Sequence, residues 1–73
     1  MSERELVMAL ERFRDLCRRG AKDGLTRLED KEFNTLETAI SDTLLGDEEL
    51  LDRYIHSFKS AIIPLIKYGF NPF

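Results

Sequence analysis

Hydrophobic residues recur at intervals of three and four along most of the chain, a pattern typical of helices that bury one face. The first stripe follows Ser2, where the sequence SERE has the form of a capping box. The pattern stops near Gly20, so we predict a first helix over residues 2–20. Its apolar stripe consists of Leu6, Ala9, Leu10, Phe13, Leu16 and Cys17.

A second helix is predicted over residues 27–45. It is preceded by a second capping-box sequence, TRLE, and followed by Gly46, a suitable C-terminal cap. Leu28 does not align with the apolar stripe of this helix, and we expect it to pack with Leu25 in the loop or the first turn. The stripe itself consists of Phe33, Leu36, Ile40 and Leu44.

A third helix is predicted over residues 47–68, with Asp47 as its N-cap. Pro64 lacks an amide hydrogen and its ring crowds the preceding turn, so we expect a kink there. Gly69 ends the pattern. The sequence therefore predicts a small all-α three-helix bundle that forms one domain over residues 1–73. The third stripe is the broadest, with Leu51, Tyr54, Ile55, Phe58, Ala61, Ile62, Leu65, Ile66 and Tyr68.

The length of the chain points to a partner subunit. Folding of 73 residues buries only about 60% of the surface that the unfolded chain exposes, and the single Cys17 cannot form an intramolecular disulfide. Small folds of this kind are often stabilised by association. We therefore predict a homodimer, or a foreign protein bound at the same surface, through the third helix and the C-terminal tail. The predicted interface consists of Leu51, Tyr54, Phe58, Ile62, Ile63, Leu65, Ile66, Tyr68, Phe70 and Phe73.

A second interpretation of the apolar tail needs no partner. The tail can fold back over the first helix, where Val7 and Met8 lie off the main stripe. We favour burial against another chain, because small single cores rarely suffice.

Charge is segregated along the chain. Residues 1–27 carry seven basic and five acidic residues, residues 28–52 carry one basic and nine acidic residues, and residues 53–73 carry three basic residues only. Attraction between neighbouring helices accounts for much of this pattern. The functional alternative is contact with an anion or an acidic partner, although a helical projection divides the cationic side chains between two flanks of the first helix. These candidates are Arg12, Arg14, Arg18, Arg19 and Lys22.

Candidate chemistry is sparse. Cys17 and His56 fall on different helices without a glycine-rich turn to form an oxyanion hole, so Cys17 is interpreted as a small buried hydrophobe. Asp52 and His56 are four residues apart and could share a metal ion, but one such pair falls short of a metal centre. We therefore predict no enzyme, no cofactor and no metal.

The expected function is regulation by binding. The chain lacks a run of eighteen apolar residues, and its N-terminus lacks the apolar run of a secretory signal, so we expect a cytoplasmic protein without a membrane span. We predict a small regulator, adaptor or inhibitor that binds another protein, of a size common among phage and mobile-element proteins. A nucleic-acid-binding regulator is disfavoured by the pI near 5.1. A binder of a small anionic ligand such as a nucleotide is the third alternative.

Overall fold

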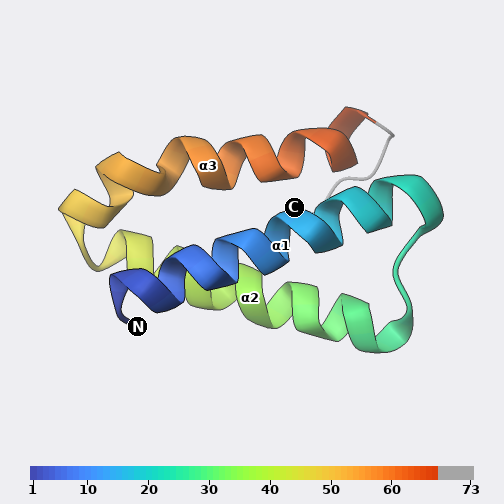
Figure 1. The fold of residues 1–73 in the computed structure, drawn as a ribbon, viewed down its shortest axis with the longest axis horizontal. Helices are drawn as coiled ribbons and strands as arrows, with labels where there is room; N and C mark the ends of the chain where they lie inside the picture. Colours follow the sequence, from blue (N-terminus) through green and yellow to red (C-terminus); the bar gives the residue numbers. More distant parts are fainter. Residues whose placement is uncertain (68–73) are drawn as a thin grey trace.

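The computed structural model describes the backbone of residues 1–67 and the side chains of residues 1–63. Within this part of the chain, three helices and no strands are present: α1 (Glu3–Asp23), α2 (Arg27–Leu45) and α3 (Glu48–Lys67). The chain runs along α1, returns along α2 and then follows the direction of α1 again along α3 (Figure 1). The predicted all-α three-helix fold is confirmed.

Both predicted capping boxes are present. The Ser2 hydroxyl accepts a hydrogen bond from the Glu5 amide at 3.2 Å, and the Glu5 carboxylate accepts one from the Ser2 amide at 3.4 Å. The corresponding distances between Thr26 and Glu29 are 3.2 and 3.1 Å. Each box satisfies amide groups that have no partner within the helix, so local chemistry fixes where α1 and α2 begin.

The predicted end of the first helix at Gly20 is wrong. Helix α1 continues to Asp23, and the amide of Gly24 donates to the carbonyl of Gly20 at 3.2 Å. Gly24 has a φ of 81° and is the one residue with positive φ among those that the structure describes. Only glycine adopts that conformation at little cost, whereas a glycine inside a helix is tolerated at about 1 kcal/mol. Gly24 is therefore the residue that ends the helix.

The connection between α2 and α3 agrees with the prediction. The Asp47 carboxylate accepts hydrogen bonds from the amides of Glu49 and Leu50 at 3.0 and 3.3 Å, as an N-cap does. Helix α3 passes position 64 and is described as far as Lys67, so its predicted last residue lies outside the described part. The kink at Pro64 stays a prediction.

The core lies between the three helices, and one ring occupies its centre. Phe13 of α1 is fully buried, with its ring centroid 4.9 Å from that of Phe33 in α2 and 5.3 Å from that of Phe58 in α3. Leu25 packs against this core, but Leu28 is 81% exposed, so the expected packing of Leu28 is wrong. Among the described side chains, the buried ones are Leu6, Ala9, Leu10, Phe13, Leu16, Cys17, Phe33, Ile40, Leu44, Phe58, Ala61 and Ile62.

Within residues 1–67, no helix combines enough length with enough hydrophobicity to cross a bilayer.

Candidate protein-binding surface

Two of the five candidate cations on α1 form ion pairs with α2. The guanidinium of Arg12 donates to both carboxylate oxygens of Glu32 at 2.8 and 2.9 Å, and it also contacts Asp15 at 3.3 Å. Arg19 lies 2.9 Å from a carboxylate oxygen of Glu29. The hydrogen bond with Arg12 lowers the pKa of Glu32 and raises that of Arg12. For these two arginines, the charge segregation of the sequence serves the packing of α1 against α2.

The other three candidates form a separate group, which we call the basic row: Arg14, Arg18 and Lys22. Intervals of four residues place them along one side of α1, and all three are exposed. Among the described residues, none of the three forms an ion pair. Lys22 lies in the last turn, where the helix dipole favours a cation, but Arg14 and Arg18 precede that turn. Among the described residues, helix packing and capping therefore give these two arginines no structural role.

The opposite end of the bundle is acidic. There Glu3 of α1 accepts hydrogen bonds from Arg53 at 3.2 Å and from the hydroxyl of Tyr54 at 2.6 Å, which ties the start of α1 to α3. The hydrogen bond from Tyr54 lowers the pKa of Glu3. Other acidic residues around the turn between α2 and α3 are exposed and form no ion pair among the described residues. They are Asp42, Asp47, Glu48, Glu49 and Asp52.

The structure divides the predicted apolar interface into buried and exposed members. Phe58 and Ile62 are 8% and 5% exposed and belong to the core of the single chain, and the half-buried Leu51 and Tyr54 pack against that core. Ile63 is 57% exposed. The participation of these residues in an interface stays a prediction. The side chains of Leu65, Ile66, Tyr68, Phe70 and Phe73 lie outside the described residues.

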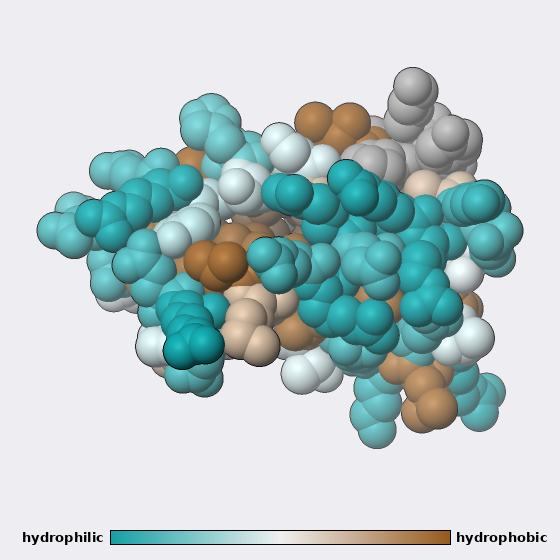
Figure 2. All heavy atoms as spheres, in the orientation of Figure 1, coloured by the Kyte–Doolittle hydropathy of each residue, from teal (hydrophilic) through white to brown (hydrophobic). Residues whose placement is uncertain are grey.

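Besides Leu28, sequence reasoning missed the exposure of Leu45. Leu45 at the end of α2 is 79% exposed. It directly follows the buried Leu44, and a step of one residue turns a helix by about 100°, so its exposure could have been predicted. On the face shown in Figure 2, exposed apolar residues appear as separate small areas among hydrophilic ones.

The two candidate catalytic side chains lie in different environments. Cys17 is fully buried, and this burial raises its pKa to about 12, which confirms its interpretation as a buried hydrophobe. At neutral pH it is therefore held as the unreactive thiol. His56 is exposed on α3. In the part of the chain that the structure describes, no three histidine, cysteine or acidic side chains form a group able to hold a metal ion.

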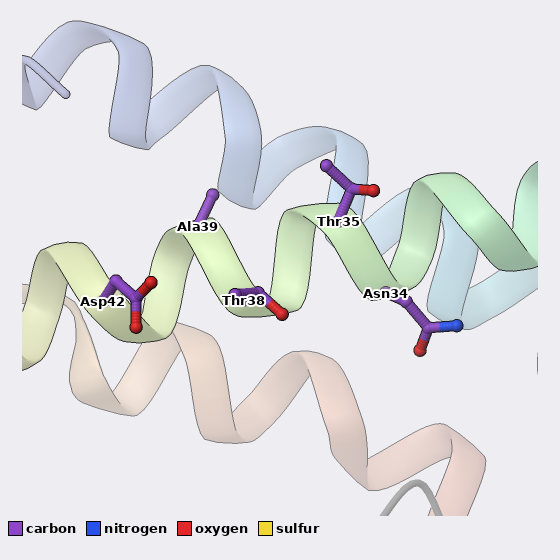
Figure 3. Close-up of a pocket in the computed structure, with 5 residues that line it drawn as sticks. All are labelled: Asn34, Thr35, Thr38, Ala39 and Asp42. Atoms are coloured by element: carbon purple, nitrogen blue, oxygen red, sulfur yellow. The ribbon is translucent and has the colours of Figure 1, made fainter.

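A hollow on α2 has little capacity to enclose a ligand. All of its lining residues come from this one helix, and Figure 3 shows their side chains along its surface, with no second helix closing over them. The hollow is open to solvent. Its lining consists of Asn34, Thr35, Thr38, Ala39 and Asp42.

Comparisons with known proteins found no match to this chain. No protein-family model, no curated protein and no solved structure matches it. The surface is therefore interpreted from its own residues, and the basic row is the candidate site.

Proposed function

We propose that this chain is a small non-enzymatic regulator that acts by binding another protein, and that the basic row contacts an acidic area of that partner. The observation that carries the proposal is the division of the α1 cations. Arg12 and Arg19 are neutralised by α2, whereas the three cations of the basic row are exposed and form no ion pair among the described residues.

The chemistry of the row suits a carboxylate-rich surface. Arg14 and Arg18 each carry a planar guanidinium that can bind a carboxylate through two hydrogen bonds. Exposed ion pairs contribute only about 0.2–1 kcal/mol each, so the row would set partner choice and association rate rather than supply most of the affinity. We assign the larger share of affinity to apolar anchors in the tail, for which Phe70 and Phe73 are the candidates from sequence.

The same cations could bind phosphate, but the rest of the molecule opposes a polyanion. The net charge is −3, and exposed acidic residues surround the turn between α2 and α3. Nucleic-acid affinity depends mainly on neutralising phosphates with Lys and Arg. The acidic residues of this chain weaken its electrostatic attraction to a nucleic acid. We therefore place an acidic protein surface ahead of nucleic acid and of a nucleotide.

The test compares two charge-reversed variants as baits in extracts of the native host, treated with nuclease. One variant reverses the basic row, with Arg14→Glu, Arg18→Glu and Lys22→Glu. The matched control carries the same change in net charge on three other exposed cations, with Arg4→Glu, Arg27→Glu and Lys31→Glu.

We expect the control to capture the same proteins as the wild-type chain. The row variant should capture at least about tenfold less of each of these proteins than the wild-type chain does. Equal capture by both variants would remove the row from the binding site. Binding of a DNA or RNA duplex at low salt, measured by fluorescence anisotropy and lost only in the row variant, would favour the nucleic-acid alternative instead. A chain truncated after Tyr68 tests the tail in the same assay.

A further inference from the structure

Helix α3 has an outer face with its own regular pattern. Phe58, Ala61 and Ile62 point into the core, whereas the outer face, which we define as Asp52, His56, Lys59 and Ile63, is exposed to solvent. The four outer residues follow steps of four, three and four, so they lie on one side of the helix. The same steps generate the contact line of paired helices.

Charge is distributed unevenly along α3. The acidic residues Glu48, Glu49 and Asp52 all lie in its first two turns, and Lys59 follows in the second half. Asp52 and Lys59 form no ion pair with any described residue. They lie about 10 Å apart along the helix axis, too far to pair with each other.

We propose that the outer face of α3 binds a second copy of this chain, with the two α3 helices antiparallel. A two-fold axis beside Ile55 and His56 places Asp52 of each protomer opposite Lys59 of the other. A two-fold contact is reciprocal, so this ion pair forms twice. A parallel arrangement would instead place like charges side by side, which disfavours it.

The antiparallel arrangement also covers exposed apolar surface. It brings Ile63, which is 57% exposed, opposite Glu48 of the partner protomer. Each protomer thus supplies one exposed apolar residue, Ile63, to the contact. A chain of 73 residues gains stability from such association.

The proposed contact differs from the one predicted from sequence. The sequence places a dimer on the third helix and the C-terminal tail, with Ile63 among the contacts, but Phe58 and Ile62 of that predicted interface are buried within one chain. The outer face lies on a different side of the helix, is exposed in the described structure, and can be contacted without opening the core. A single helix from each protomer offers less area than the roughly 1,200–2,000 Å² of a standard interface, so we expect a dissociation constant in the micromolar range.

Sedimentation equilibrium of the full chain tests the proposal, over loading concentrations from about 5 μM to about 500 μM. The variants Asp52→Lys and Lys59→Asp each place like charges across the contact, so each is expected to weaken self-association at least about tenfold. An equimolar mixture of the two restores opposite charges at both contacts. We expect the mixture to form heterodimers with an affinity within about threefold of the wild-type dimer.

Three further variants distinguish this arrangement from nonspecific association. The double variant with Asp52→Lys and Lys59→Asp should dimerise like the wild type, and Ile63→Glu should be monomeric. Leu28→Glu, at an exposed apolar site on α2, should leave the dimer unchanged. A wild-type chain that remains monomeric at every concentration overturns the proposal, and so does a mixture that fails to associate although both variants are helical by circular dichroism. No foreign partner enters this experiment, so its outcome is independent of the proposed regulatory function.

Discussion

The central prediction concerns Phe13, because its ring is the contact shared by all three helices. It is fully buried, stacks on Phe33 of α2 with an interplanar angle of 19°, and meets Phe58 of α3 at 40°. Replacing a buried phenylalanine with alanine costs about 3–5 kcal/mol. Typical stability of about 0.05–0.15 kcal/mol per residue gives this chain roughly 4–11 kcal/mol in total. We therefore expect Phe13→Ala to lose a large part of the stability of the fold.

The assay is urea unfolding followed by circular dichroism, with the free energy of unfolding obtained by linear extrapolation. A second variant, Phe13→Leu, keeps most of the apolar volume and loses the ring contacts, for which we expect a loss of about 1–2 kcal/mol. Met8→Ala on the exposed side of α1 is the matched control, with an expected change within about 0.5 kcal/mol. All chains are compared at one low concentration, because self-association would add to apparent stability.

The result that would refute this reasoning is a small effect of the alanine variant. A loss below about 1 kcal/mol for Phe13→Ala would mean that its ring is not enclosed by the three helices as described. A loss for Phe13→Leu as large as that for Phe13→Ala would assign the effect to the ring contacts rather than to buried volume.

Three further predictions address single residues. Cys17, whose pKa is raised to about 12 by burial, should react with a thiol reagent in native buffer only as fast as the chain unfolds, and at once in denaturant. Burial raises the pKa of Glu37, so the ionised carboxylate destabilises the folded state at any pH above the pKa that Glu37 has in the unfolded chain. Glu37→Gln should therefore raise the urea midpoint at neutral pH. This gain should vanish near about pH 3, where the carboxyl group is protonated in both states. Gly24→Ala should lower the free energy of unfolding in urea by about 1–3 kcal/mol, because alanine rarely adopts the positive φ of this residue. A steric clash would not contribute, since a Cβ atom there meets no other atom within 4 Å.

Local sequence signals predicted where the helices begin, but not where α1 ends. The capping boxes at Ser2 and Thr26 act within a few residues, so their sequences suffice. The segment RRGAKDG contains two glycines, and each could end a helix. Ala21 packs against the core when the helix continues beyond Gly20, and that contact depends on the other helices. Tertiary packing therefore decided between Gly20 and Gly24.

The division of the cations was only partly predictable. A helical projection places Arg12 with Arg19 on one flank of the apolar stripe, and Arg14 with Arg18 on the other. It does not tell which flank faces the acidic α2, because that depends on the handedness of the bundle. In the structure, α2 lies beside Arg12 and Arg19, which are paired with Glu32 and Glu29. The sequence thus predicted two groups of cations, and only the fold assigned a structural role to one of them.

The two proposed contacts follow from the same constraint on a small bundle. The apolar stripe of α1 and the described part of the α3 stripe are used in the core, so in these segments a binding surface must consist of the side chains that folding leaves exposed. On α1 these include the basic row, and on α3 they include the outer residues around Lys59 and Ile63. The two sets belong to different helices, and neither requires the core to open. Self-association through α3 can therefore stabilise the fold while the basic row of each protomer binds a partner, giving a dimer two binding sites and the added avidity of bivalent attachment.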